Sequence, residues 1–376
     1  MISIAVAYAN YATSESGGAR ESLLTLLDGL AQHRDIVVEA YQTPPTDDFP
    51  ETTYPYDVHV RDTVEVPKLT WANQVVERAQ WRRYLSDEIG TEHDLLITQN
   101  ELGPASISVA ESKGIPSLLF IRSMALTGCE KYDPNRGSVA NLIKTDLGGR
   151  VQYPFLKKNF DQYRSAANAA THTIANSEFT TDKIRNLFNC ESQVIYPPIK
   201  LENYLVDYNP EGYTTMVNPR AEYKGADIFL DIAESMQQEQ FLLVGPIAST
   251  QIEHRANDMG NVTHWSWCDD MREAYRESKA VVVPSRVEEA FGRVPAEAMV
   301  SGIPCVVSDR GGLLEVVGDT GEVVSQIDST RHWVEAIDSA LERHDPEAQK
   351  RRVQRFSAVS QSEKLCHIVN ELIPSV

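Results

Sequence analysis

The chain has 376 residues, of which 35 are lysine or arginine and 54 are aspartate or glutamate, so its formal net charge is −19. Its length suits two domains better than one core, and its hydrophobic content of 42% is ordinary for a globular protein. A chain this acidic repels the phosphates of nucleic acids and anionic lipid surfaces. The composition therefore argues against nucleic-acid partners and allows at most a peripheral membrane contact.

The N-terminal sequence MISIAVAYANY begins directly as a strand and has no basic region, so no signal peptide is expected. The longest apolar runs, such as Phe241–Val244, are far too short to span a bilayer. The five cysteines are widely spaced and form no C-x-x-C or Cys/His cluster, which favours reduced thiols over disulfides or zinc. The sequence predicts a cytoplasmic protein without a metal site.

Apolar runs of strand length alternate with helix-period segments, which is typical of parallel βα units. In the first half, strands are predicted at Ile2–Tyr8, Ile36–Tyr41, Asp94–Gln99, Ser117–Arg122, Thr171–Asn176 and Gln193–Tyr196. Helices are predicted there at Ala19–Gln32, Trp71–Ile89 and Thr180–Phe188. The turn formers between Pro197 and Pro210 predict an interdomain linker.

The second half repeats this layout. Its strands are predicted at Thr214–Asn218, Phe241–Val244, Val262–Trp267, Ala280–Pro284, Pro304–Ser308 and Gly321–Ser325. Its helices are predicted at Gly225–Met236, Asp269–Glu277, Pro295–Val300, Gly312–Val317 and Thr330–His344, with a final amphipathic helix at Pro346–Leu372. The fold class is therefore α/β, with two doubly wound parallel-sheet domains.

The glycine pair Gly17-Gly18 follows the first strand and its loop, Ala9–Ser16, and precedes a helix. Glycine lets a backbone approach a ligand closely, and a helix start offers free N–H groups to an anion. A plain turn explains the same pair equally simply.

Two cations, Arg220 and Lys224, follow the strand predicted at Thr214–Asn218. An arginine can grip phosphate oxygens bidentately and a lysine adds a point charge, so together they suit a diphosphate. The alternative is a pair of solvated surface cations.

Two carboxylates eight positions apart, Glu289 and Glu297, lie on a strand-exit loop and in the first turn of a helix. That places both on the rim of a parallel sheet where ligands bind, and carboxylates accept hydrogen bonds from hydroxyl-rich ligands such as sugars. Solvated charges near a helix start are the simpler alternative.

Two further features have a structural and a functional interpretation. Trp265 and Trp267 alternate along a predicted strand, and either could flank a nucleobase, although core packing accounts for them as well. The segment Tyr153–Arg164 mixes aromatic and basic residues, as in an amphipathic helix with a solvated face or in a contact for an anionic or lipid-linked acceptor.

In chain order, four stretches carry a family resemblance: Gly17-Gly18, ANSEFT at 175–180 with VIYPPI at 194–199, NPRAEYKG at 218–225, and EAFG at 289–292 followed by Glu297. With the last stretch matching the signature E-x-F-G-x-x-x-x-E, the chain resembles the retaining family 4 glycosyltransferases of GT-B architecture. The resemblance implies two Rossmann-like domains facing a central cleft. It implies an acceptor-side domain at 1–198, a nucleotide-sugar-binding domain at 199–355, and a C-terminal helix at 356–376 that crosses back to the first domain.

The resemblance also implies roles for single residues. Glu289 would contact the transferred sugar, Glu297 the ribose hydroxyls, and Arg220 and Lys224 the donor phosphates. The catalytic set is thus Glu289, Arg220 and Lys224. The donor site would also use Gly17, Gly18, Trp265, Phe291, Gly292 and Arg293.

The expected activity is metal-independent transfer of a hexose from a UDP- or GDP-sugar to a hydroxyl of a glycan, a lipid-linked acceptor or a small molecule, with retention and without a further cofactor. The chain departs from the family where a histidine normally follows the strand at 117–121, since Arg122 and Ser123 stand there. Two alternatives remain: a GT-B sugar-nucleotide-binding protein with impaired catalysis, and a GT-B-like sugar-nucleotide epimerase. The sequence does not fix the oligomeric state, the sugar, the base or the acceptor.

Overall fold

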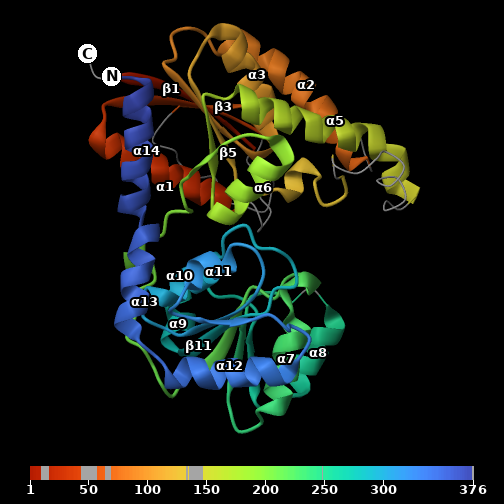
Figure 1. Ribbon diagram of the computed structural model, residues 1–376, viewed down its shortest axis with the longest axis vertical. Coiled ribbons are helices and arrows are strands. Elements are labelled where there is room, and N and C mark those ends of the chain that lie inside the picture. The colour runs from red at the N-terminus through yellow and green to blue at the C-terminus, as the bar shows by residue number, and fades with distance from the viewer. Residues whose placement is uncertain are drawn as a thin grey trace. The chain divides into compact units, whose positions relative to one another are not determined.

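The computed structural model describes residues 1–9, 17–43, 57–63, 69–132, 134, 147–247 and 249–374 (Figure 1). Most of the predicted loop Ala9–Ser16, residues 10–16, lies outside this description. The chain forms two compact units, one of Met1–Pro197 with Ser362–Val376 and one of Pro198–Gln361. The sequence had placed these divisions after residues 198 and 355.

The first unit is built on a seven-stranded parallel sheet in the order β3-β2-β1-β4-β5-β6-β7. Its strands are β1 (Ile2–Tyr8), β2 (Ile36–Gln42), β3 (Asp57–Val60), β4 (Leu95–Gln99), β5 (Ser117–Ile121), β6 (His172–Ala175) and β7 (Gln193–Val194). The strand order reverses direction between β1 and β4, as in a doubly wound sheet.

Helices cover both faces of this sheet, because alternate residues of each strand point to opposite sides. In β1, Ile4 and Val6 pack with α1 (Gly17–His33) and α14 (Ala358–Leu372), whereas Ala5 and Ala7 belong to the opposite core. That core also takes residues from α2 (Thr70–Glu88), α3 (Gly103–Lys113), α5 (Leu147–Ala169) and α6 (Glu178–Phe188). The last segment of the chain therefore completes the first unit, where α14 runs beside α1 (Figure 1).

The second unit has a six-stranded parallel sheet in the order β10-β9-β8-β11-β12-β13. Its strands are β8 (Tyr213–Val217), β9 (Phe241–Val244), β10 (Val262–Trp265), β11 (Ser278–Val283), β12 (Cys305–Ser308) and β13 (Glu322–Val324). Its helices are α7 (Ala226–Ser235), α8 (Thr250–Asp258), α9 (Met271–Arg276), α10 (Arg293–Met299), α11 (Leu313–Val317), α12 (Thr330–Glu342) and α13 (Pro346–Val353). The predicted fold class of two Rossmann-like parallel-sheet domains is confirmed.

The predicted final helix, Pro346–Leu372, is wrong as a single element. It is divided into α13, a 3-10 turn at Gln354–Phe356, and α14. The break is a short strand-like contact: Ile199 N–H donates to Phe356 O at 2.8 Å and Ala358 N–H donates to Ile199 O at 2.9 Å. A distant segment thus replaces the intrahelical hydrogen bonds at this point, which no local pattern signals.

Among the described strands and α-helices, β3, α3 and α8 were not predicted, and α5 was anticipated only in part, as the amphipathic-helix interpretation of Tyr153–Arg164. Strand β3 is a short edge strand, and α3, with the sequence GPASISVAESK, is rich in residues of low helix propensity. Most of α3 is nonetheless buried, so packing rather than propensity stabilises it.

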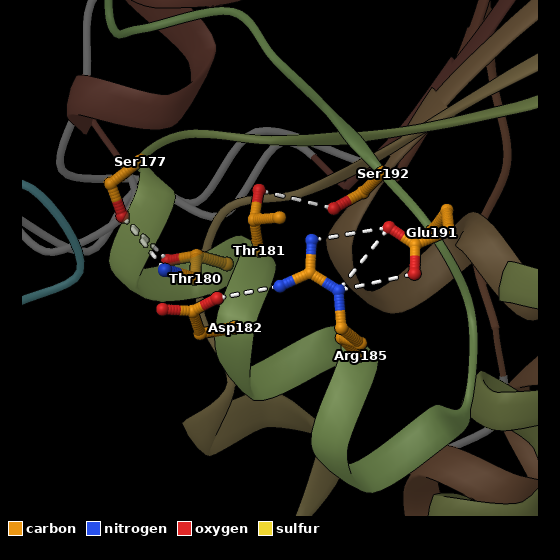
Figure 2. Close-up of polar contacts among 7 residues, drawn as sticks. All are labelled: Ser177, Thr180, Thr181, Asp182, Arg185, Glu191 and Ser192. Carbon is orange, nitrogen blue, oxygen red and sulfur yellow. Dashed lines mark hydrogen bonds and ion pairs between the residues drawn. The ribbon is translucent and has the colours of Figure 1, made fainter.

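Helix α6 shows how the stretch ANSEFT at 175–180 forms its local structure (Figure 2). The Ser177 side chain caps the helix by accepting from Thr180 N–H at 3.0 Å. At the far end, Arg185 donates to Asp182 Oδ1 at 2.7 Å and grips Glu191, which fixes the turn into β7. The ANSEFT stretch is thus explained by helix capping.

Docking of α14 on α1 requires a glycine at position 29. A Cβ added there would lie 2.0 Å from Ser362 Oγ and 2.3 Å from Ser362 Cβ. We expect Gly29→Ala to lower the free energy of unfolding by about 1–3 kcal/mol, measured by urea denaturation. Adding Ser362→Gly should recover part of the loss, whereas Gly260→Ala, with no atom within 4 Å of the new Cβ, should not show the clash. A fully tolerated Gly29→Ala would contradict this packing.

Candidate functional site

The strand order of the second unit reverses between β8 and β11, whose carboxyl ends are therefore the expected ligand-binding edge. The chain leaves β8 through Asn218, which has a left-handed φ of 61°, and leaves β11 through Pro284. The two exits touch at Gly225: a Cβ there would lie 2.1 Å from Pro284 O, and its φ is 80°. Glycine is required because another backbone occupies the place of a side chain.

This contact brings Lys224 and Glu289 together. Lys224 Nζ lies 2.7 Å from Glu289 Oε1, and the two side chains are 25% and 19% exposed. Ser285 Oγ donates to the same carboxylate oxygen at 3.0 Å. Glu289 Oε2 accepts no hydrogen bond within the described residues, so one oxygen is fixed and the other is available to a ligand.

The loop that carries Glu289 rests on the glycine pair Gly311-Gly312. Gly312 N–H donates to Glu289 O at 2.7 Å. A Cβ on Gly311 would lie 2.3 Å from Glu289 O, and one on Gly312 would lie 2.8 Å from Ala290 O. The pair Gly311-Gly312 thus has a structural role, because it lets the Glu289 loop lie directly on the exit of β12.

The second carboxylate, Glu297, lies on α10 in a separate polar cluster. Arg293 Nε donates to Glu297 Oε1 at 3.1 Å, and the Tyr275 hydroxyl donates to Oε2 at 3.0 Å. Arg293 Nη2 lies 3.4 Å from the hydroxyl oxygen of Tyr204, in the segment that enters the second unit. Glu297 is only 10% exposed, so it is held from both sides before any ligand arrives.

Both tyrosines of this cluster remain neutral donors. Burial, and after it the charge of Glu297, raise the pKa of Tyr204 to about 12. The same two causes raise the pKa of Tyr275 well above its usual value. Glu297 is therefore surrounded by groups that stay protonated at any physiological pH.

The other predicted site residues have varied surroundings. Arg220 is exposed and makes no hydrogen bond or ion pair among the described residues. Phe291 is buried and packs edge-on against Phe356, with ring centroids 5.1 Å apart. Gly292 has a φ of 111° and precedes α10, so it turns the chain from the Glu289 loop into that helix.

Trp265 is the last residue of β10 and packs against Leu242, Val244 and Ala274. The strand stops there, so the expected alternation does not extend to Trp267, which is 68% exposed and donates to Asp269 Oδ1 at 2.6 Å. Trp265 is partly buried at the edge of this small apolar cluster, and its role towards a ligand stays a prediction.

Two predicted residues, Gly17 and Gly18, form the first turn of α1 in the first unit. Arg122 directly follows β5, in the region where the sequence comparison had expected a histidine. It is 6% exposed and donates through Nε to Gln99 Oε1 at 2.7 Å. Its carbonyl accepts from Asn176 Nδ2 at 2.8 Å, so the exits of β4, β5 and β6 are joined by hydrogen bonds.

Sequence reasoning missed Ser285, Tyr275 and Tyr204. Ser285 directly follows the strand exit and could have been found from that position. Tyr275 and Tyr204 carry no such signal, because their relation to Glu297 depends on how distant segments pack.

Within the residues that the structure covers, no group of three or more histidine, cysteine, aspartate or glutamate side chains is arranged to hold a metal ion. No helix among those residues is long and apolar enough to cross a bilayer.

Residues 213–343 match the family model described as Glycosyl transferases group 1. The sucrose-phosphate synthase of Thermosynechococcus elongatus has a similar structure, with a TM-score of 0.75 and 16% identity over 99% of each chain. HepE from Anabaena, solved in complex with UDP, has a TM-score of 0.70 and 16% identity, over 99% of this chain and 100% of the other. The chain has the GT-B fold.

Curated relatives match over shorter stretches. The O-antigen chain mannosyltransferase RfbU of Salmonella typhimurium is 22% identical over 49% of this chain and 56% of its own length. The lipopolysaccharide 1,2-N-acetylglucosaminetransferase of the same organism is 40% identical over 20% of this chain and 21% of its own length. These matches cover about half of the length of the mannosyltransferase and about a fifth of the length of the N-acetylglucosaminetransferase.

The glycine support of the Glu289 loop can be tested with two alanine variants. Gly311 and Gly114 have similar left-handed φ values, 63° and 69°, but only Gly311 has backbone atoms in the way of a Cβ. We expect Gly311→Ala to lower the free energy of unfolding by about 1–3 kcal/mol more than Gly114→Ala, measured by denaturant titration. Equal losses would show that the loop has room for a side chain.

Proposed function

We propose that the protein transfers a sugar from a nucleotide-diphosphate donor to an acceptor hydroxyl. The observation that carries this proposal is the Lys224–Glu289 ion pair at the β8/β11 edge, within the segment that matches the group 1 model. A cation and a carboxylate side by side suit a ligand with a phosphate next to a polyol. The glycosyltransferase names of the partial relatives support the same activity.

The hydrogen-bond capacity of the pair supports separate roles for its members. An ammonium has three N–H groups, and Lys224 uses one on Glu289, so two are left for phosphate oxygens. Glu289 Oε1 already accepts from Lys224 and Ser285, which leaves Oε2 for hydroxyls of the transferred sugar. Lys224 would thus bind the diphosphate and Glu289 the sugar, without breaking their contact.

Arg220 would be the second phosphate cation. Its side chain is exposed and uncommitted in the described part of the chain, so it can reorient towards a bound anion. A guanidinium can grip phosphate oxygens bidentately, and the neighbouring Lys224 adds a point charge.

In the proposed reaction, the bond between the anomeric carbon and the leaving phosphate oxygen breaks as the acceptor oxygen bonds to that carbon from the same face. The electron pair of the broken bond stays on the phosphate, which takes the acceptor's proton. Configuration is retained, and neither a protein base nor a metal is needed. Lys224 and Arg220 stabilise the charge on the phosphate; one such preorganised donor typically contributes about 3–4 kcal/mol.

The donor would be a UDP- or GDP-hexose, and the acceptor a glycan, a lipid-linked sugar or a small molecule. The first unit would bind the acceptor, and Gly17 and Gly18 at the start of α1 are candidate binding residues there. The alternative is a protein that binds sugar nucleotides without turning them over. The turnover assay described next distinguishes it from an active transferase.

Activity is measured as release of nucleoside diphosphate from a panel of UDP-, GDP- and ADP-sugars with mixed acceptors. We expect Lys224→Met and Glu289→Gln each to lower turnover by about 100-fold or more, because each removes charge stabilisation or sugar contact in the transition state. Melting temperatures should change by only a few degrees, since a partly exposed ion pair contributes about 1 kcal/mol or less.

Lys279→Met is the matched control, because Lys279 also pairs with a glutamate, Glu239, at the opposite end of β11. It should keep wild-type turnover. Full activity in Lys224→Met or Glu289→Gln would contradict the assigned roles, and tight binding of a donor without any turnover would favour the binding protein.

A further inference from the structure

Helix α5 has an outward face that the proposed function does not use. The helix packs beside α2 and α3 on one side of the first sheet (Figure 1). Its inward face is buried and largely aromatic, with Tyr153, Leu156, Phe160 and Tyr163 in the core. Burial of that face explains why the helix is stable. It does not explain why the opposite face is also partly apolar.

The outward face begins with the stripe Val151, Pro154, Phe155 and Lys158, whose positions i, i+3, i+4 and i+7 lie on one side of a helix. Val151 is 70% and Phe155 is 38% exposed. Pro154 and Lys158 are exposed as well. Apolar side chains that gather on the water-facing side of a helix are typical of a surface that binds a partner.

The start of α2 lies against the same turn of α5. Trp71 N–H donates to Gln152 Oε1 at 2.9 Å. Leu69, two residues before Trp71, is exposed, and so is Val151, directly before Gln152. Two helix starts that touch each other thus both present an aliphatic side chain to solvent.

The charge of α5 is opposite to that of the chain. The helix contains four basic residues, Arg150, Lys157, Lys158 and Arg164, and one acidic residue, Asp161, so its net charge is +3 in a chain of −19. Asp161 pairs with Lys157 at 2.6 Å and with Arg164 at 2.9 Å. Arg150 and Lys158 are exposed and make no ion pair among the described residues. Their charges are available to an anionic partner.

We propose that this face of α5 docks on the surface of an anionic lipid bilayer. Val151 and Phe155 would enter the headgroup region, and Arg150 and Lys158 would contact lipid phosphates. A bilayer surface offers anionic groups and an apolar phase side by side, which is the combination that the face presents. A nucleic acid offers the phosphates alone. The acidic residues of the second unit oppose the contact little, because charges more than about 10 Å from the lipid are screened at physiological salt.

Vesicle sedimentation of the full chain tests the proposal. Vesicles of phosphatidylcholine mixed with phosphatidylglycerol are compared with vesicles of phosphatidylcholine alone. We expect the protein to bind the mixed vesicles and not the neutral ones. Binding should weaken as salt is raised, because salt screens the attraction between basic side chains and lipid phosphates.

Two pairs of substitutions separate the charged and the apolar contributions. Arg150→Glu with Lys158→Glu should weaken binding to the mixed vesicles about tenfold or more, because each basic residue near an anionic surface contributes a several-fold factor. Val151→Ser with Phe155→Ser should weaken it about tenfold, because less apolar surface leaves water. All four residues are exposed, so the melting temperature should stay within a few degrees of the wild-type value.

The matched control is Arg331→Glu with Arg343→Glu. Both arginines are exposed, on and directly after α12 in the second unit, and their reversal changes the net charge by the same amount. This variant should bind the mixed vesicles as the wild type does. An equal loss in the control would show that net charge alone governs binding, and would overturn the assignment to α5.

The proposal would also be overturned if the wild-type protein did not bind the mixed vesicles, or if both α5 variants bound them unchanged. A dimer in analytical ultracentrifugation that Val151→Ser with Phe155→Ser dissociates, without vesicle binding, would identify a second copy of the chain as the occupant instead. None of these measurements uses a sugar donor, so the docking surface and the proposed function can fail independently.

Discussion

The contact between Gly225 and Pro284 is the constraint on which the candidate site depends. A side chain at position 225 would collide with the Pro284 carbonyl, and only this close approach of the β8 and β11 exits places Lys224 Nζ 2.7 Å from Glu289. These residues are 65 positions apart in the chain, so the sheet topology creates the pair. The strand order that reverses between β8 and β11 leaves their exits uncovered by a crossover helix.

The carboxylates of Glu289 and Glu297, on the same loop-helix segment, have different hydrogen-bond partners. Glu289 is held through one oxygen by Lys224 and Ser285, and Glu297 is held through both oxygens by Arg293 and Tyr275. Glu289 therefore keeps one carboxylate oxygen that accepts no hydrogen bond in the described part of the chain, whereas both oxygens of Glu297 already accept one. The same residue type is thereby held in two different ways by its neighbours.

Much of the architecture follows from local sequence. Strands such as Phe241–Val244 are short apolar runs between polar turns, and their bounds agree with the prediction. Helix α3 could not be found in this way, since its burial rather than its composition stabilises it. The break at Ser357 depends on hydrogen bonds from Ile199, more than a hundred residues away in the chain.

As with the fold, local sequence predicts some residues of the candidate site, and tertiary packing decides the rest. The positions of Lys224 and Glu289 on strand exits follow from the βα pattern, whereas their pairing depends on the strand order, which the sequence does not give. Tyr204 was not predictable, because 89 residues separate it from Arg293 and only tertiary packing joins them. For Trp265, the alternation along a strand does not distinguish packing against an apolar cluster, which the structure shows, from contact with a ligand.

A crystal structure with a bound nucleoside diphosphate tests the central claim most directly. The account predicts the diphosphate within hydrogen-bonding distance of Lys224 Nζ and the ribose hydroxyls against Glu297. A nucleotide bound elsewhere, for example at the β1/β4 edge of the first unit, with Lys224 and Glu289 untouched, would contradict it.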